Sequence, residues 1–546
     1  MGNELKRILL CFCCMFLVWG VRGQLPPGAT PYEVQVSGTP DPGYMFIGPR
    51  SLNPSDLYPS SLMLLDAEGE LIWYAEVADD TAAPYFNFTV YDFKPLGGGF
   101  LSYWQPKFTG GKFFILDSTF TVVDSVSCPS RPATDEHDII RQQDGSFIMI
   151  CADDTVLDAS ALNTTTGAQG SQTAVVPFQE IQELDINRNI AFVWNILDHI
   201  PIEDSDTAHF NGPSFLDYSH VNSVFRYGDE VVISSRNLNE ITSFSRSTGE
   251  VYWRLGGKGN QFLIVGDSIP FRAQHDANVD DNGHVYFFDN GSEGAGSLAR
   301  YVEYELDTAA MVATLVREHR HPKNYRSLFM GNSIKLPNDH VIVAWGGCFP
   351  QDSTAQVTEF APDGSIVMEL DLPEDYLTYR VHKEALPFKL PRPQLTCDNA
   401  AQTLTAPWGH DSYWWSNGET TRSIVVQDTG TYQVWVNQGM GRISSEKVYV
   451  GDVSNVCAGV SVPEFAEELL RVYPNPVLER LSVELPPDVR RVWTLEVRDV
   501  LGRVVMREKG RTGEIEVEVG EWAEGVYSLR LEGRNGKVYR GKFVKQ

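Results

Sequence analysis

Short runs of apolar or alternating apolar and polar residues fill the chain between Gln24 and about Leu390. Gly, Asn, Asp and Pro separate these runs, and the spacing of about 3.6 residues that is typical of amphipathic helices is almost absent. Alternating runs bounded by such turn residues are typical of β-strands. The pattern therefore predicts an all-β fold for this part of the chain.

A phrase of related sequence recurs in this region: one strand ends near an Asp or a polar turn, and an apolar strand follows. The phrase covers residues 62–74, 113–125, 181–194, 241–253, 302–316 and 357–370. Units that end alike and follow one another at about 50 to 70 residues have room for four strands each. The repeat predicts a six-bladed β-propeller, with a pair of sandwiches or a β-helix as the alternatives.

The sequence changes in character after Pro391. Short strands and a D-x-G-x-Y phrase, formed by Asp428, Gly430 and Tyr432, are typical of an immunoglobulin-like sandwich. Val434 stands where an antibody domain has its second Cys, so the usual bridge between the sheets is not expected. The segment resembles Ig-like modules of bacterial surface proteins, and we interpret it as a spacer.

The tail from Val472 onward is expected to form a small β-sandwich of about seven strands. It contains YPNP at 473–476, a D-x-x-G-R phrase at 499–503 and GVY-x-L at 525–529. These motifs resemble the C-terminal sorting domains of the type IX secretion system of Bacteroidota. The resemblance implies an interaction with the type IX secretion machinery, export across the outer membrane, removal of the tail, and release or attachment at the cell surface.

The N-terminus is typical of a secretory signal peptide, with two basic residues, an apolar run over 8–20 and Gly23 before the expected cleavage point. A lipoprotein signal is the alternative, because three Cys lie within the run. The predicted organisation is a signal peptide at 1–23, a propeller at 24–390, an Ig-like module at 391–465 and a sorting domain at 466–546.

Five Cys remain after loss of the signal peptide, and export favours disulfides. Cys397 and Cys457 flank one module and are candidates for a pair, as are Cys128 and Cys151, which leaves Cys348 over. No cluster of Cys and His has the spacing of a zinc site, so no metal is expected.

The chain has a formal net charge of −28, and its acidic residues are concentrated in the middle, because the tail from Ala466 onward holds 15 basic and 14 acidic residues. An acidic body argues against a nucleic-acid partner. No stretch after the signal peptide reaches about 18 apolar residues, so no membrane span is expected in the mature chain.

Three histidines share one position of the repeat, since His137, His220 and His275 each stand eight residues before the Gly of a following turn. In the sixth unit Gly331 occupies this position, where it is expected to leave room. Equivalent positions at the start of the innermost strands of a propeller surround the mouth of the central channel. We therefore expect the three histidines to converge on the axis.

A set of segments resembles the arylsulfotransferase family, the PAPS-independent aryl-sulfate sulfotransferases and their relatives. The segments occur in the order seen in that family: DYSHVNSV, VVISSRNLNEI, GEVYWRLGG, QHDANVDDNGHVYFFDNG, SLARYVEYELD, ATLVREHRHP and GNSIKLPNDHVIVAWGG. The match is strong over 215–350 and collinear over roughly 40–375. The resemblance implies a six-bladed propeller that transfers a sulfuryl group from a small phenolic sulfate donor to a phenol acceptor through a sulfated histidine. Because the donor is an ester, no cofactor is expected.

Carried over residue by residue, the resemblance implies catalytic roles for His220, His275 and Arg300. The S-R phrase that carries Arg300 is looser here, because its serine has moved to Ser297. A neutral imidazole is a good nucleophile near pH 7, and cationic neighbours stabilise charge on the transferring oxygens. The best-studied branch of the family uses a further histidine in a later blade as its nucleophile, so which histidine takes the sulfuryl group here stays open. The candidates after Arg300 are His319, His321, His340 and His382, and none of them aligns cleanly. We add His321 and His137 to the catalytic candidates.

Three further residues near the histidines are candidates for substrate binding. Asn222 and Asp276 either contact the substrate or brace their histidines and tie off strand ends. Arg236 either binds an anion at the channel or pairs with an acidic side chain. Asp289, Asn290 and Gly291 are interpreted as a turn.

The sequence leaves two other functions open. A propeller that keeps the fold without the chemistry would act as a non-catalytic binding or adhesion module at the cell surface. A hydrolase of sulfate or phosphate esters would use water in place of the phenol acceptor.

Overall fold

The computed structural model describes residues 25–51, 60–78, 90–107, 110–206, 208, 212–291, 298–349, 355–460, 470, 472–483, 493–499, 503–510, 515–523, 525–533 and 538–545. The predicted signal peptide at 1–23 lies outside these residues. Among the described residues, no helix has the length and apolar character needed to cross a bilayer.

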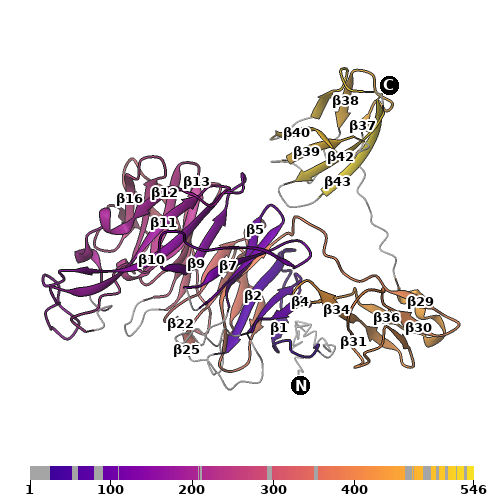
Figure 1. Cartoon of the computed structure of the whole chain (residues 1–546), viewed down its shortest axis with the longest axis horizontal. Helices are drawn as coiled ribbons and strands as arrows, with labels where there is room; N and C mark the ends of the chain where they lie inside the picture. The colour runs from indigo at the N-terminus through magenta and orange to yellow at the C-terminus, as the bar shows by residue number, and fades with distance from the viewer. Residues whose placement is uncertain are drawn as a thin grey trace, which may run out of the picture.

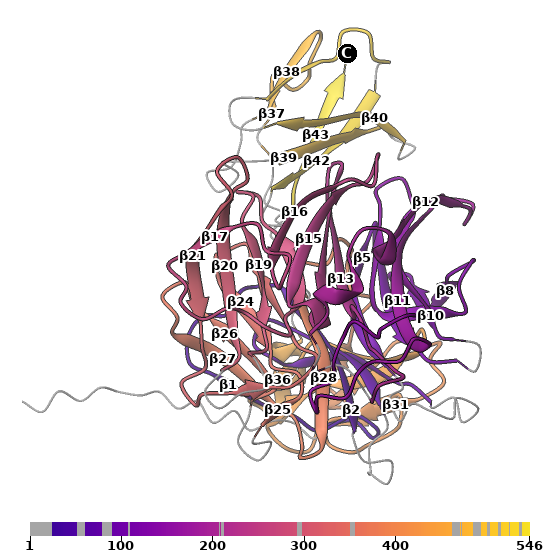
Figure 2. The same ribbon diagram turned by 90° about the vertical axis from the view of Figure 1, so that its left-hand side faces the viewer.

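Six sheets, each with four antiparallel main strands, form the body of the protein (Figures 1 and 2). From the innermost strand outward, the first three blades are β28 (Tyr376–Glu384), β2 (Tyr44–Ser51), β3 (Ser61–Leu65), β4 (Leu71–Glu76); β5 (Tyr91–Gly97), β6 (Phe100–Gln105), β7 (Lys112–Leu116), β8 (Val122–Val126); and β9 (Ala133–Arg141), β10 (Phe147–Leu157), β11 (Ala174–Leu184), β12 (Ile190–Asn195). The other three are β13 (Val221–Tyr227), β14 (Glu230–Ser235), β15 (Glu240–Ser245), β16 (Val251–Gly256); β18 (His275–Val279), β19 (Val285–Asp289), β20 (Arg300–Asp307), β21 (Val312–His319); and β23 (Asn332–Lys335), β24 (Val341–Ala344), β26 (Val357–Phe360), β27 (Ile366–Asp371).

The six innermost strands close into a ring, because each of them contacts the innermost strand of the next blade, in the order β28, β5, β9, β13, β18, β23 and back to β28. The first blade joins the two ends of the propeller sequence, since β28 comes from residues 376–384 and its three partners from residues 44–76. A second closure pairs β1 (Glu33–Val36) with β27. The predicted all-β, propeller-like fold is confirmed.

The six recurring phrases are the hairpins between the third and fourth strands of the six blades. In five of them an Asp side chain accepts from backbone N–H groups of the turn, at Asp66, Asp117, Asp185, Asp307 and Asp363. Asp66 accepts hydrogen bonds from the backbone N–H groups of Glu68 and Glu70, at 3.1 and 2.8 Å. Asp117 and Asp185 make the same pair of contacts two and four residues ahead. A short carboxylate that satisfies turn amides explains why Asp recurs at this place in the sequence.

The segment after Pro391 is joined to the propeller by strand pairing. Its strands are β29 (Thr396–Asp398), β30 (Thr403–Thr405), β31 (Tyr413–Trp415), β32 (Ser423–Val425), β33 (Gly430–Tyr432), β34 (Val434–Gln438), β35 (Gly441–Ser444) and β36 (Val448–Val450). Strand β35 pairs with β4, so the sheet of the first blade continues into the module.

The module also shares a hydrophobic core with the first two blades. Trp73 stacks on Phe120 with ring centroids 4.4 Å apart, and Trp415 and Ile443 are buried in the same cluster. The interpretation of this segment as a spacer is therefore wrong. The sequence suggested a spacer because pairing across the exposed edge of a sheet leaves no local signal in either strand.

The covalent links agree with the sequence analysis. Cys128 is bonded to Cys151 and Cys397 to Cys457, while the buried Cys348 lies outside both disulfides. In the D-x-G-x-Y phrase, the Tyr432 hydroxyl donates to the carbonyl of Asp428 at 2.8 Å, the contact that a tyrosine corner makes.

The tail has a core of its own. Its described strands are β37 (Val472–Tyr473), β38 (Arg480–Val483), β39 (Trp493–Arg498), β40 (Val504–Gly510), β41 (Ile515–Glu518), β42 (Gly525–Gly533) and β43 (Val538–Lys545), drawn in yellow in Figure 1. They form sheets of three and four strands around a separate cluster that includes Leu495, Leu531 and Phe543.

The shared core predicts that the module and the propeller unfold together. Ile443, fully buried opposite Trp73, is the test position. We expect Ile443→Ala to lower the free energy of unfolding by about 2 to 5 kcal/mol in one common transition, measured by urea denaturation. Val425→Ala, at a half-exposed position of the module, is the control and should change it little. A separate, earlier transition of the module with an unchanged propeller transition would contradict the shared core.

Candidate active site at the propeller axis

One repeat position supplies a ring of side chains at one end of the innermost strands. The offset of eight residues before a turn Gly, which relates the three histidines, also selects Tyr91 before Gly99. In the first blade the corresponding place is taken by Tyr379 of β28, whose ring centroid lies 5.2 Å from that of Tyr91. Around the axis, the ring consists of Tyr379, Tyr91, His137, His220, His275 and Gly331.

The three predicted histidines lie together at this ring. The imidazoles of His137 and His220 meet edge to face with centroids 4.9 Å apart, and the ring of Tyr379 lies 6.1 Å from that of His137. His275 is close enough to His220, His137 and Arg236 for each of them to lower its pKa. Residues from four blades thus meet in one place.

Irregular backbone aims these side chains. The pairing of the inner strands shifts register beside the ring, between Val221 and Ser223 and between His275 and Asn278. His220 and Asp276 have φ of +50° and +59°, in the left-handed region that side-chain-bearing residues seldom adopt. A bulge bends a strand and redirects its side chains, and such bulges are common next to active sites.

His275 is held in one tautomer. Its Nδ1 lies 2.8 Å from Oδ1 of Asn290 and 3.0 Å from the carbonyl oxygen of Ala273. The orientation of the Asn290 amide is fixed, because its Nδ2 donates to the carbonyl of Met330 and to the Ser327 hydroxyl, both at 2.9 Å. Two acceptors at Nδ1 place the proton there, so Nε2 keeps its lone pair.

The surroundings of His275 keep it neutral. Burial lowers its pKa well below the usual value, and the charges of Arg236 and His220 lower it further. The hydrogen bond to Asn290 acts in the other direction without reversing the shift. A neutral imidazole with a free Nε2 is the form that attacks an electrophile.

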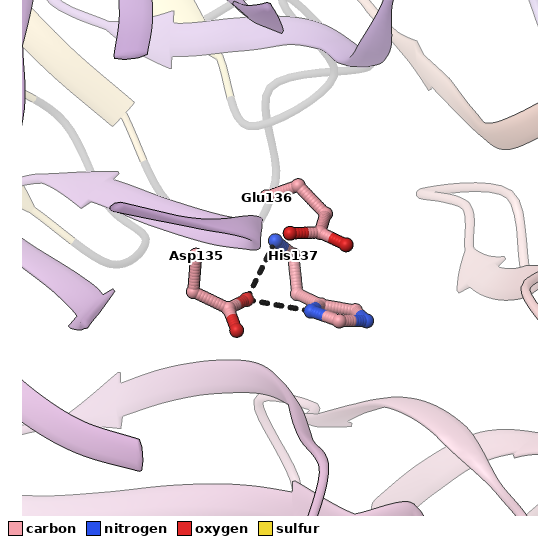
Figure 3. Close-up of side chains that lie close together, drawn as sticks. All are labelled: Asp135, Glu136 and His137. Atoms are coloured by element: carbon pink, nitrogen blue, oxygen red, sulfur yellow. Dashed lines mark hydrogen bonds and ion pairs between the residues drawn. The ribbon is translucent and has the colours of Figure 1, made fainter. Parts of the chain in front are cut away.

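His137 is tuned the opposite way. Burial alone would lower its pKa, but the Asp135 carboxylate, whose Oδ1 lies 2.5 Å from Nδ1, raises the pKa to about 9 (Figure 3). The adjacent Glu136 adds to this effect, and burial raises the pKa of Glu136 itself. His137 is therefore cationic at neutral pH and able to donate a proton from Nε2.

The trio in Figure 3 could also be considered as a metal site. The ligand atoms of Asp135, Glu136 and His137 lie within 4.8 Å of one another. A cation with ligands at about 2.0–2.2 Å would hold two of them roughly 3 Å apart. The 2.5 Å contact between Asp135 and His137 is shorter than that and fits a hydrogen bond between ionised partners. We therefore assign the trio to charge control of His137.

His220 and Arg236 form the more open side of the cluster. The side chain of His220 is 31% exposed, and its Nδ1 lies 3.1 Å from Oδ2 of Asp217. Arg236 belongs to a 3₁₀ turn, η4 (Arg236–Leu238), and two of its nitrogens donate to Asn237 Oδ1 and to the carbonyl of Leu328. These contacts anchor the guanidinium beside His275, whose pKa its charge lowers.

The sixth position of the ring is closed. A Cβ at Gly331 would lie 2.5 Å from Phe288 and 2.7 Å from the carbonyl oxygen of Ala344, and φ is +86°. The expectation that Gly331 leaves room is wrong, because Phe288 fills the space. The same crowding excludes a histidine at this position.

Arg300 and His321 have other surroundings. The guanidinium of Arg300 is buried among the carboxylates of Asp267, Asp289 and Glu318, with contacts of 2.7 to 3.2 Å. Nε2 of His321 donates to Glu369 of β27 at 2.9 Å, and the imidazole stacks on the ring of Tyr325, between outer strands of the fifth and sixth blades. Neither has a contact with the three ring histidines among the interactions of the described residues, so we leave both out of the site.

Asn222 and Asp276 brace the ring. Asn222 is fully buried, donates to the carbonyl of Gln274 at 2.8 Å and accepts from the backbone N–H of Asp276 at 3.3 Å. Asp276 lies 3.4 Å from Nη1 of Arg380. These contacts favour the bracing role over direct contact with a substrate.

Sequence reasoning missed several residues of the cluster. Tyr91 was within reach, because it obeys the same eight-residue offset. Nothing in the sequence indicated the roles of Asp135 and Asn290, because their contacts with His137 and His275 are made by the folded chain. Asn290 was interpreted only as a turn residue. Tyr379 is buried with a hydroxyl that has no hydrogen-bond partner, and it comes from the last strand of the propeller.

Fold and site together define a β-propeller with a histidine centre on its axis. Residues 101–372 match the family model described as Arylsulfotransferase (ASST), and residues 471–546 match that described as Secretion system C-terminal sorting domain. The chain therefore carries an arylsulfotransferase family domain and ends in a type IX secretion sorting domain. The sorting domain directs export to the cell surface or release.

Other comparisons add little. No curated protein matches the chain. A lignostilbene dioxygenase of Pseudomonas brassicacearum is 9% identical over 66% of this chain and 96% of that chain, with a TM-score of 0.35. An exo-β-1,3-galactanase of Phanerochaete chrysosporium is 9% identical over 87% of this chain and 99% of that chain, with a TM-score of 0.29. At such scores the likeness carries no conclusion.

The raised pKa of His137 gives a prediction for Asp135→Asn. Loss of the carboxylate should lower the pKa of His137 by about 1 to 3 pH units, measured by NMR titration of the imidazole. The pKa of His137 is higher in the folded protein than in the unfolded chain. The ion pair of His137 and Asp135 therefore stabilises the fold fully below about pH 6.5, and this stabilisation is lost as the pH rises through 9.

Urea unfolding should therefore show a larger stability difference between wild type and Asp135→Asn at pH 6 than at pH 10. Asp154→Asn, at an exposed position of the same blade, is the control. An unchanged titration of His137 in Asp135→Asn would show that the ion pair does not set its charge.

Proposed function

We propose that this protein is a secreted aryl-sulfate sulfotransferase that moves a sulfuryl group from a phenolic sulfate ester to a phenol through a sulfated His275. The observation that carries the proposal is the state of His275: neutral, with its proton fixed on Nδ1 by Asn290, and surrounded by cationic or polar groups. The match to the arylsulfotransferase family supports the same reaction class.

In the first half of the reaction, Nε2 of His275 attacks the sulfur of the donor, and the bond between sulfur and the phenolic oxygen breaks. The imidazole becomes cationic when it carries the sulfuryl group, and its Nδ1–H remains bonded to Asn290. The leaving phenolate takes a proton from His137, which Asp135 holds in the cationic form.

In the second half, the acceptor phenol replaces the donor phenol. His137, neutral after the first half, takes the phenolic proton, and the oxygen attacks the sulfur on His275. The bond between sulfur and Nε2 breaks, and both histidines return to their starting states. One proton thus passes from His137 to the first phenol and back from the second, so no cofactor is required.

The sulfuryl oxygens need donors while the group is transferred. Arg236, which donates to Asn237 and to the carbonyl of Leu328, and the half-exposed His220 are the groups we assign to this role. Tyr379 adds a buried hydroxyl that has no hydrogen-bond partner, and leaving such a group unpaired costs free energy in the substrate-free protein. An oxygen of a bound sulfuryl group would accept a hydrogen bond from this hydroxyl. Two of these residues lie on the half-exposed side of the cluster, from which a substrate enters.

The proposal predicts that His275→Ala abolishes transfer. With the full chain, p-nitrophenyl sulfate and phenol, we expect kcat to fall at least about 1,000-fold, because the step that makes the covalent intermediate is lost. His284→Gln, which changes a histidine bound to Glu303 outside the ring, is the matched control and should keep near-normal activity.

The acceptor distinguishes the remaining functions. Release of p-nitrophenol by the wild type that depends on phenol agrees with transfer, whereas equal release without phenol indicates a hydrolase. No release with any phenol, together with binding of the sulfate ester, would indicate a binding module and overturn the proposal.

A further inference from the structure

Arg380 occupies the centre of the innermost strands. It lies on β28, the strand that closes the propeller, and is 3% exposed. Its Nη1 lies 3.4 Å from Asp276, 3.5 Å from Asp92 and 3.8 Å from Asp138, and Nη2 donates to the carbonyl of Asn222 at 2.5 Å. One guanidinium from the first blade therefore contacts the second, third, fourth and fifth blades.

The partners of Arg380 are the sequence neighbours of the ring. Asp138 follows His137 and Asp276 follows His275, while Asp92 follows Tyr91. Arg380 itself follows Tyr379. The contacts form a layer directly behind the ring, so a shift of this layer moves the backbone that carries both reacting histidines.

The backbone at this layer needs external support. Asp92, His220 and Asp276 have positive φ, and a non-glycine residue keeps this conformation only where surrounding contacts over-determine it. Asp138 also accepts from the backbone N–H of Val224 at 3.0 Å, which ties the third blade to the fourth. The multiple contacts of Arg380 supply this support for three blades at once.

The charge of Arg380 cannot be removed without a local rearrangement. Three buried carboxylates, those of Asp92, Asp138 and Asp276, face the guanidinium. Two of them have other basic partners as well: Lys94 pairs with Asp92 and Asp138, and His382 lies 2.9 Å from Asp92. Among the described residues, the ion pair of Asp276 is with Arg380, and one of the Asp276 oxygens has no hydrogen-bond partner. Loss of the guanidinium leaves the buried Asp276 carboxylate, next to His275 in the sequence, without its ion-pair partner.

We propose that Arg380 is the positioning residue of the site: its guanidinium, supplied by the closing strand, holds Asp138 and Asp276 and through them the imidazoles of His137 and His275. The expected effect of Arg380 on kcat rests on the proposed function, whereas its contacts with the two carboxylates do not. Strand β28 lies beyond the residues 101–372 that match the arylsulfotransferase family, so the matched segment alone lacks this group. The reaction is thereby coupled to closure of the propeller.

Arg380→Lys is the variant that tests the proposal. A lysine keeps the charge but replaces a planar fork of donors with one point charge, which cannot reach partners on four blades. We expect kcat to fall about 10- to 100-fold while KM stays within about threefold, because misplaced groups lower the rate of the chemical step. Arg254→Lys is the matched control: Arg254 pairs with Asp204 and Glu240 away from the ring, and its replacement should leave kcat near the wild-type value.

An NMR measurement tests positioning without any reaction. The Nδ1–H of His275 should give a hydrogen-bonded proton signal in the wild type and in Arg254→Lys, and this signal should be shifted or lost in Arg380→Lys. If the wild type transfers no sulfuryl group, the proposed function fails, and the NMR result still decides whether Arg380 positions His275.

Normal kcat and an unchanged His275 signal in folded Arg380→Lys would overturn the proposal. If this variant does not fold, Asp276→Asn replaces it, since it removes the charged partner through which Arg380 holds His275 with little change of shape. The expected result is again a lower kcat with an unchanged KM, and an unaltered kcat in folded Asp276→Asn would overturn the proposal in the same way.

Discussion

A cation buried on the axis is the constraint on which the rest of the structure depends. Burying a charge is costly unless it is paired and hydrogen-bonded, so the place of Arg380 requires three carboxylates and a backbone carbonyl from four other blades. Arg380 reaches those partners only when its own strand, β28, has closed the ring of innermost strands. The polar centre therefore specifies the closed propeller, while the apolar cores between the blades supply most of its stability.

Above this layer, the environment separates two histidines that start with the same chemistry. His275 is buried near cationic groups and stays neutral, whereas His137 lies against a carboxylate and stays charged. Opposite shifts of neighbouring groups are how a site assigns a nucleophile and a proton donor at one pH. The division follows from burial of His275 beside Arg236, which lowers its pKa, and from the Asp135 carboxylate at Nδ1 of His137, which raises the pKa of that group.

The repeat predicted the fold because the Asp-closed hairpins are local features, and the fixed offset before a turn Gly predicted the convergence of the three histidines. The choice among arginines could not be predicted. Arg300 is surrounded by three carboxylates, whereas Arg236 lies close enough to His275 to lower its pKa, and the fold assembles both sets of neighbours. The pairing of β35 with β4 was hidden for the same reason, since a sheet edge does not encode its partner.

The central claim is that His275 carries the sulfuryl group between the two phenols. The most direct test is mass spectrometry of the full chain, quenched after brief exposure to p-nitrophenyl sulfate without a phenol acceptor and mapped by peptide fragmentation. The account predicts one added sulfuryl group on His275 that disappears when phenol is supplied. A sulfuryl group on His137 or His220 instead, or transfer that proceeds with no protein adduct, would contradict it.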